Sequence, residues 1–279
     1  IMCIGSDAGM RDFLPEWTAL WRRLPGVTPF QSPAWLMAWW RHFGTGAPRV
    51  LTARAGEGLV GVLPIYELRE PGICKLLPIG IGLSDYIDAL IEPAWPDCGE
   101  AMLTAIADIP DWDECHLPDL PEGGVLHGAR GPAELSEGRG DGMPCPVLAL
   151  PDRAAALATV VPRKTLRDAR QAASRAEAAG GVRIETADAA TLSAMLDNLF
   201  RLHEARWRTR GEPGVLADPA VQGFHRDAAP ALAAGAMLRL YRMHIGEAVA
   251  AVYYGFAWQG RAYAYIGGFD PEMPRLSPG

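Results

Sequence analysis

The alternation of apolar and polar residues is most regular near the C-terminal end, where it predicts three consecutive strands. The first is Met237–Ile245. The next, Ala248–Trp258, is apolar at both alternating positions, as in a central strand that is covered on both faces. The third is Arg261–Asp270. Its paired glycines, Gly267 and Gly268, favour a bulge or the close approach of a ligand.

Helical periodicity precedes these strands. An apolar stripe runs along one predicted helix that Asp188 caps, through Leu192, Leu196, Leu199, His203 and Trp207. A second helix starts at Asp218-Pro219, an N-cap followed by proline. The first half has the same arrangement, with an amphipathic helix at Phe13–Leu24 and a helix that Ser32 caps. Strands follow there at Arg49–Ala55, Leu59–Arg69 and Ile73–Ile79.

Both halves therefore predict two helices, a hairpin and a third strand. Even the hairpin turns match, RAGEGLVGV at Arg54–Val62 and HIGEAVAAV at His244–Val252. We expect an internal duplication of one unit, in a mixed α/β class with mostly antiparallel sheets and flanking helices. The predicted domains are residues 1–150, a linker helix at 151–181 and residues 182–279. A helix at Ala101–Ile109 and short strands at Glu114–Leu117 and Val147–Leu150 complete the first.

The predicted linker helix is strongly basic, with few large apolar residues. Its cations are Arg163, Lys164, Arg167, Arg170 and Arg175. Two interpretations stay open, a solvated linker and a site that holds phosphate or another anion. Overall charge does not decide between them, because residues 1–150 carry 10 Lys/Arg against 20 Asp/Glu and residues 151–279 carry 16 against 13. The absence of a broad basic face disfavours DNA binding.

Composition is that of an ordinary globular chain, with 49% hydrophobic and 21% charged residues. No apolar run approaches the roughly 20 residues that cross a bilayer, and the N-terminus lacks a secretory pattern, so we expect a cytoplasmic protein. The five cysteines contain no CxxC pair and are expected to be reduced. The six histidines show no metal-ligand spacing, and the GxSxG, GxxxxGK[ST] and HExxH motifs are missing. Three tryptophans in Trp35–Trp40 suit either a core helix or an aromatic sugar platform.

Four motifs carry a resemblance to a known family: FQSPAWLMAWW (Phe30–Trp40), SDYID (Ser84–Asp88), RKTLRDARQ (Arg163–Gln171), and LHEARW (Leu202–Trp207) with FHRD (Phe224–Asp227). Together they resemble GNAT-superfamily acetyltransferases of the CelD/BcsL type, which are linked to cellulose and exopolysaccharide biosynthesis and are relatives of the FemAB tandem-GNAT proteins. The resemblance implies a transferase that uses acetyl-CoA or another acyl-CoA, needs no metal, and acts on a sugar, amine or polysaccharide precursor. Two alternatives stay open, a FemAB-like transferase that uses aminoacyl-tRNA and a non-catalytic module that binds a polysaccharide-synthesis partner.

The resemblance also implies site residues. Tyr265 would donate to a departing thiolate, and either Asp270 or His203 would serve as base. A turn residue and a core histidine are the simpler interpretations of these last two. In the family, the turn corresponding to Ser277-Pro278-Gly279 opens a helix that cradles a pyrophosphate, so the predicted cofactor residues are Gly267, Gly268, Ser277 and Gly279. Since the chain stops there, we expect a fragment with weakened cofactor binding.

The acceptor is expected between the two units. One wall of this predicted cleft would be Asp85 and Tyr86. The other would be formed by His203, Arg206 and Trp207 with Tyr254 and Tyr265. Polar and aromatic groups beside glycines on an apolar framework are typical of small-molecule sites.

Overall fold

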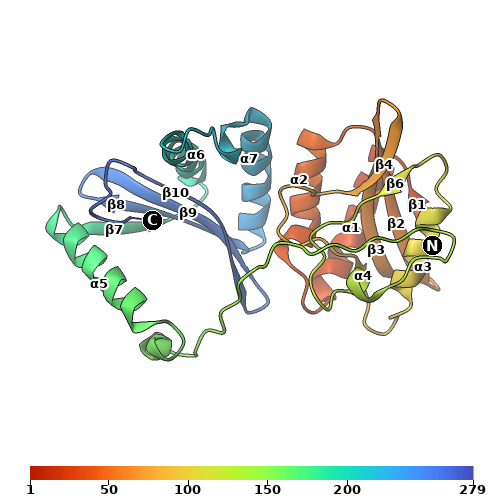
Figure 1. Cartoon of the computed structure of the whole chain (residues 1–279), viewed down its shortest axis with the longest axis horizontal. Coiled ribbons are helices and arrows are strands. Elements are labelled where there is room, and N and C mark those ends of the chain that lie inside the picture. Colours follow the sequence, from red (N-terminus) through yellow and green to blue (C-terminus); the bar gives the residue numbers. More distant parts are fainter. Residues whose placement is uncertain (279) are drawn as a thin grey trace. The chain divides into compact units, whose positions relative to one another are not determined.

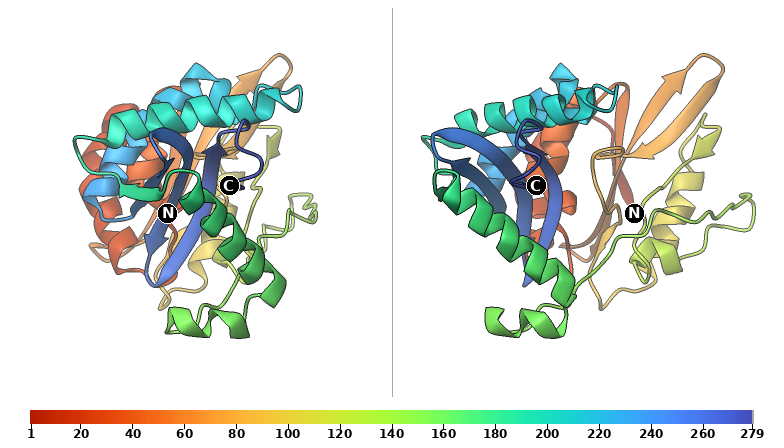
Figure 2. Two further views of the ribbon diagram at one scale, coloured as in Figure 1. Left: turned by 90° about the vertical axis from the view of Figure 1, so that its left-hand side faces the viewer. Right: turned by 60° about the vertical axis from the view of Figure 1, so that its left-hand side comes forward.

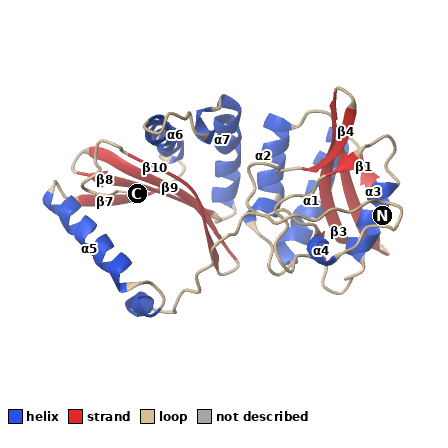
Figure 3. Cartoon of the chain, in the orientation of Figure 1, coloured by secondary structure: helices blue, strands red, loops and turns tan. Residues whose placement is uncertain are grey.

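The computed structural model describes residues 1–278. The chain divides into two compact units, Ile1–Met143 and Pro144–Gly279 (Figure 1). Each unit is built on one sheet with helices packed against it (Figure 3). The sheets contain six and four strands among the described residues, which confirms the predicted mixed α/β class.

The sheet of the C-terminal unit is antiparallel throughout. Its order is β10-β9-β8-β7, formed by β7 (Val182–Thr186), β8 (Leu238–Ile245), β9 (Ala248–Trp258) and β10 (Arg261–Phe269). The predicted meander is confirmed, and β9 is the most buried strand of the four. The expectation that β9 is covered on both faces is wrong in part, because Tyr253 keeps 39% of its surface exposed.

Two helices cover one face of this sheet, and a third lies on the opposite side (Figure 2). The first two are α6 (Leu192–Arg208) and α7 (Pro219–Ala234), joined through the short 3-10 helix Val215–Ala217. The third is the basic helix α5 (Arg163–Ala178), which follows the 3-10 helix Ala154–Thr159. As predicted, Asp218 caps α7, with Oδ1 accepting from the Ala220 N–H at 2.7 Å.

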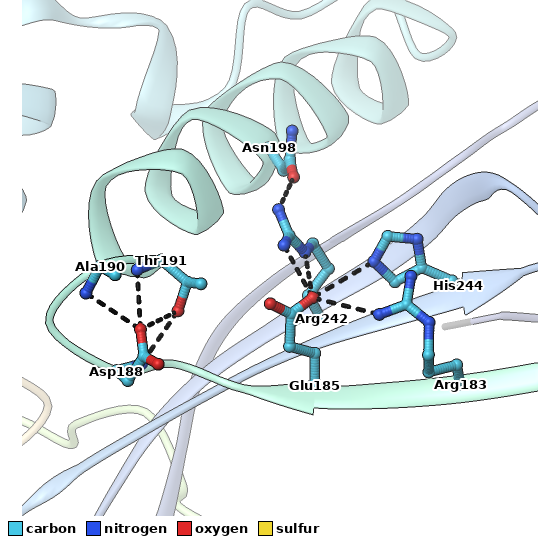
Figure 4. Close-up of polar contacts among 8 residues, drawn as sticks. All are labelled: Arg183, Glu185, Asp188, Ala190, Thr191, Asn198, Arg242 and His244. Carbon is cyan, nitrogen blue, oxygen red and sulfur yellow. Dashed lines mark hydrogen bonds and ion pairs between the residues drawn. The ribbon is translucent and has the colours of Figure 1, made fainter.

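Polar contacts fix the start of α6 and the edge strand β7 (Figure 4). The Asp188 carboxylate accepts from the Thr191 N–H at 2.8 Å and organises a turn, so α6 begins at Leu192, later than the capping prediction implied. Three residues earlier, in β7, Glu185 accepts two hydrogen bonds from Arg242, at 2.7 and 3.1 Å. These bonds lower the pKa of the Glu185 carboxyl. They join β7 to β8 beneath α6.

The sheet face opposite α6 and α7 is covered at one end. Ala176, near the end of α5, packs there with Ile245, Ala250, Met273 and Leu276. Farther along the same face, Ile184 and Tyr253 are exposed, and Tyr253 stacks on Tyr241 with ring centroids 6.0 Å apart. Strand β9 is therefore fully buried only on the face that packs against α6 and α7. On the opposite face, its apolar residues are covered only where α5 and the segment after β10 pack.

The sheet of the N-terminal unit has the order β1-β2-β3-β4-β6, with β5 paired to β3. Its strands are β1 (Met2–Ile4), β2 (Ala47–Ala55), β3 (Gly58–Glu70), β4 (Ile73–Pro78), β5 (Leu90–Ile91) and β6 (Glu114–Cys115). The helices are α1 (Asp7–Arg23), the 3-10 helix Pro29–Gln31, α2 (Pro33–Phe43), α3 (Cys98–Ala107) and α4 (Val125–Gly128). Helices α1 and α2 cover one face, and α3 and α4 the other (Figure 1).

The tryptophans of α2 belong to the core of the N-terminal unit. Trp35, Trp39 and Trp40 are at most 8% exposed. Their indole N–H groups donate within that unit: Trp35 to Ser84 Oγ at 3.0 Å and Trp39 to the carbonyl of Ile81 at 3.1 Å. The core interpretation therefore holds, and the aromatic platform is wrong.

Six helices and strands in each unit share one order and one hairpin irregularity. Strand, two helices and three strands occur as β1-α1-α2-β2-β3-β4 and again as β7-α6-α7-β8-β9-β10. Each hairpin turns at a glycine with positive φ, Gly56 at 59° and Gly246 at 58°. Each also carries a bulge with one extra residue, Val60 in β3 and Ala250 in β9, at the same distance from that glycine. A bulge is a specific backbone feature, so its repetition supports duplication of the unit.

Two boundaries differ from the prediction. Val147–Leu150 is no strand but exposed chain, with Val147 87% exposed, because β-branched and aliphatic residues form a strand only beside a partner strand. Helix α1 begins at Asp7 rather than at Phe13, because the Ser6 hydroxyl accepts from the Gly9 N–H at 3.1 Å and caps an additional turn and a half.

Helix α6 and strand β10 are in close contact at Gly268. A Cβ atom at this position would lie 2.6 Å from the backbone nitrogen of His203 and 2.9 Å from Leu202 Cβ. Both distances are too short for real contacts, and the first atom belongs to a rigid helix backbone. At the neighbouring Gly267, a Cβ atom would meet only the Val252 carbonyl oxygen, at 3.4 Å. Gly268 is therefore required by packing, and Gly267 is not.

We expect Gly268→Ala to destabilise the C-terminal unit by about 2 kcal/mol, because α6 must move away from β10. Gly267→Ala is the matched control, with an expected change of less than about 1 kcal/mol. Urea unfolding of both variants measures the difference. Equal stability of the two would show that α6 does not depend on the glycine.

Candidate active site

A bulge marks the middle of β10. One extra residue, Tyr265, lies between Ala264 and Ile266, which keep regular partners on β9. The sequence suggested a bulge at the paired glycines, but Gly267 and Gly268 are both in regular register. The prediction of a bulge is therefore confirmed, and its position is corrected: the glycine pattern reflects the approach of α6 instead. Bulges re-aim side chains and are frequent beside active sites.

The bulged tyrosine belongs to a buried cluster with one residue from α7 and one from β9. His225 lies edge-on to Tyr254 and Tyr265, with ring centroids 5.3 and 5.7 Å away. His225 and Tyr254 are fully buried. Burial lowers the pKa of His225 to about 3 and raises the pKa of Tyr254. Both rings are thus neutral over the physiological pH range, and two titratable side chains occupy positions that an ordinary core would fill with Leu or Phe.

His225 is the residue that the sequence interpretation missed. The FHRD motif contains it, but the helical apolar pattern assigned the neighbouring Phe224 to the core and assigned no role to His225. A signal was present in the duplicated framework. Counting from the capping residues Ser32 and Asp218, the position of His225 in α7 corresponds to Trp39 in α2. A polar ring that replaces an apolar one at a duplicated core position points to a local function.

The second group of candidate residues lies at the C-terminal end of α6. His203 is 3% exposed, whereas Arg206 and Trp207 are half-buried. The rings of His203 and Trp207 lie 5.9 Å apart, and Gly214, with φ of 73°, packs closely on both. No described residue hydrogen-bonds to His203 Nδ1. Burial, and secondly the charge of Arg206, lower the pKa of His203 to about 4.

Three further predicted residues lie beyond β10. Asp270 continues from the strand, with its N–H donating to the Ala250 carbonyl at 2.8 Å, and its carboxylate accepts from the Glu272 N–H at 2.9 Å. It thus stabilises the turn that the sequence indicated. Ser277 follows in irregular chain with φ of 48°. The predicted cofactor residue Gly279 lies outside the described residues.

Asp85 and Tyr86 belong to the N-terminal unit. The Tyr86 ring is half-buried, 6.2 Å from the ring of Phe30. Asp85 is exposed in part, yet surrounding protein atoms and, secondly, the charge of Asp119 raise the pKa of its carboxyl to about 6. The expected cleft between these residues and α6 stays a prediction.

One protein-family model matches the C-terminal part of the chain. Residues 163–279 match the acetyltransferase (GNAT) domain family. The matched segment begins with the first residue of α5 and includes both helices on the sheet and the bulged strand. A search of curated proteins found no match. This match supports acyl transfer in general for the matched segment, and GNAT acetyltransferases generally use acetyl-CoA as the donor.

The described residues 1–278 contain no group of three or more His, Cys, Asp or Glu side chains arranged to hold a metal ion. None of their helices combines the length and the apolar character that a membrane span needs.

The buried histidines make stability depend on pH. His203 has its pKa lowered from an ordinary value near 6.5 to about 4, so the unfolded chain binds a proton more readily than the folded one. Its contribution to stability is complete above about pH 6.5 and is lost as the pH falls through about 4.

We expect urea unfolding midpoints of the C-terminal unit to fall between pH 7 and pH 4.5, and His203→Phe to reduce this fall. The exposed His116 provides the control, since His116→Phe should leave the pH dependence unchanged. A His203→Phe variant with the full wild-type pH dependence would contradict the assignment.

Proposed function

We propose that the chain is an acyl-CoA-dependent acyltransferase of the CelD/BcsL type, which transfers an acetyl or related acyl group to nitrogen or oxygen of a sugar, amine or polysaccharide precursor. The observation that carries the proposal is the GNAT match over a segment that ends in a bulged strand. Tyr265, the residue at the bulge, packs against the buried His225. Its hydroxyl gives β10 a polar group on a sheet face that is otherwise apolar.

The acyl-CoA supplies the thioester. The C–S bond of the thioester breaks, and a C–N or C–O bond to the acceptor forms. The protein must hold both partners, stabilise the carbonyl oxygen as it gains charge, take the proton of the acceptor and return a proton to the departing sulfur. The candidate residues are assigned to these tasks.

Tyr265 is the proposed donor to the departing sulfur. A phenol has a proton to give at neutral pH. The bulge sets its position, and the neighbouring rings of His225 and Tyr254 restrict its rotation. Tyr254 itself is fully buried, and its hydroxyl has no hydrogen-bond partner among the described residues. Because it is buried, Tyr254 is proposed to act on the acceptor subsite through its ring contact with Tyr265, whose centroid lies 5.8 Å away, and not by direct contact with the acceptor.

His203 and Asp270 are the proposed proton acceptors. A pKa near 4 keeps the His203 imidazole neutral at pH 7, so its ring can take a proton, although burial makes it a weak base. Asp270 is only half-buried and carries one hydrogen bond to its carboxylate, which leaves further acceptor capacity. Different pH–rate profiles of His203→Gln and Asp270→Asn would identify the base.

Gly267 fits the approach of a cofactor better than Gly268 does. A side chain at Gly267 would meet one carbonyl oxygen at 3.4 Å, so this backbone is accessible from its own face of the sheet. The face of Gly268 is filled by α6. Ser277 and the half-buried pair Arg206 and Trp207 complete the proposed binding residues on this unit, and Asp85 and Tyr86 are the proposed acceptor contacts of the other.

The proposal is tested by incubating the protein with acetyl-CoA and a panel of amino sugars, polyamines and oligosaccharides, and measuring free CoA thiol. Acceptor-dependent thiol release supports it. Transfer only from aminoacyl-tRNA would favour the FemAB-like alternative, and no transfer from either donor would favour a partner-binding module.

We expect Tyr265→Phe to lower kcat by about 100- to 10,000-fold, the usual range for loss of one general acid, with the KM for acetyl-CoA changed less than about threefold. The control is Tyr241→Phe, because Tyr241 stacks on Tyr253 on the sheet face opposite Tyr265 and His225. Steady-state kinetics with the best acceptor provide the measurement. A Tyr265→Phe enzyme with wild-type kcat would remove the tyrosine from the mechanism.

A further inference from the structure

Three arginines lie at the C-terminal end of α6 and in the turn after it: Arg206, Arg208 and Arg210. Cations are expected at this end of a helix, because the backbone carbonyls give it partial negative charge. That explanation applies to all three equally. Their contacts, however, divide them into two kinds.

Arg208 has an acidic partner, whereas Arg206 and Arg210 have none. Arg208 Nε lies 3.5 Å from the Glu204 carboxylate, one helical turn away. Among residues 1–278, no carboxylate lies within ion-pair distance of Arg206 or Arg210. Both guanidinium groups instead lie over aromatic rings. Arg206 is 4.7 Å from the centroid of Phe269, and Arg210 is 5.4 Å from that of Trp207.

Stacking on a ring fixes the plane of a guanidinium group and leaves its N–H edge free to donate. Two parallel N–H donors on such an edge match two oxygens of a phosphate, and this bidentate geometry is stronger and more selective than a single charge. Arg206 and Arg210 therefore present preorganised donors, whereas the Arg208 side chain is paired with Glu204 and stacks on no ring that the structure describes.

The two stacked arginines adjoin the candidate active site. Phe269 is the last residue of β10, four positions beyond the bulged Tyr265. On the other side, Trp207 packs on His203 and on Gly214 of the connection to α7. The two stacked arginines thus contact the end of β10 and the C-terminal end of α6, the two elements that carry the candidate active-site residues.

We propose that Arg206 and Arg210 form a subsite for a phosphate group carried by one of the two substrates. The statement that this subsite belongs to an active site rests on the proposed function. Phosphate binding itself depends only on the two guanidinium groups, so inorganic pyrophosphate can be used as the probe.

The test compares matched Arg→Lys variants. Lysine keeps the positive charge at the helix end but loses the planar fork, so Arg206→Lys and Arg210→Lys retain the favourable helix-end charge and lose bidentate binding. Arg208→Lys is the control in the same helix turn. Calorimetry at about 0.15 M salt limits general electrostatic attraction. We expect pyrophosphate to bind the wild type and the control alike, and at least tenfold more weakly to each of the other two.

Equal pyrophosphate affinity of all four proteins, or no binding by the wild type, would overturn the proposal. Equal weakening by Arg208→Lys would overturn it too, because charge alone would then account for binding. These results do not depend on turnover. Pyrophosphate binding by a protein without transferase activity would contradict the proposed function and leave the phosphate subsite intact.

Two ligands identify the source of the phosphate. Acetyl-CoA carries phosphates, and acetylpantetheine carries the same thioester without them. If Arg206→Lys weakens binding of acetyl-CoA but not of acetylpantetheine, the subsite serves the donor. If it weakens pyrophosphate binding and leaves both thioesters unaffected, the subsite serves a phosphorylated acceptor. Either result supports the subsite.

Discussion

The candidate site depends on the contact between α6 and β10 at Gly268. The helix backbone comes so close that a methyl group there would lie 2.6 Å from the nitrogen of His203. This contact brings the last two turns of α6 over the end of the strand. It places Arg206 on Phe269 and keeps His203 buried between the helix and the loop at Gly214. Without it, the side chains of LHEARW and those of the bulged strand would belong to separate surfaces.

The bulge at Tyr265 is the second constraint. Because β10 gains one residue relative to β9, Tyr265 packs with Tyr254 and Phe256 on the helix side of the sheet, where His225 also lies. In the N-terminal unit, the short strand β4 pairs with β3 without a bulge. The helix position corresponding to His225 is there occupied by Trp39, whose indole binds the chain after β4. The two units share a framework, and the polar replacements occur in the C-terminal one.

Local patterns predicted most of the framework correctly. The caps at Ser32-Pro33 and Asp218-Pro219, the central strand and the matching hairpins are encoded within short stretches of sequence, so their physical causes can be read there. The position of the bulge could not be read, because it depends on the pairing register of β10 with β9. The paired glycines indicate a bulge at their own position. Gly268 is instead required by the close packing of α6, whose residues lie some sixty positions away in the sequence. His225 was missed for the same reason, since the two tyrosines that it contacts lie on two different strands.

The central claim is that acyl transfer takes place at the bulged strand and the end of α6. Hydrogen exchange with and without acetyl-CoA, followed peptide by peptide, tests it most directly. The account predicts slower exchange in residues 264–270 and 203–210 when acetyl-CoA is bound, with unchanged exchange in β1 to β4. Protection confined to the N-terminal unit, or none at any acetyl-CoA concentration up to the millimolar range, would contradict it.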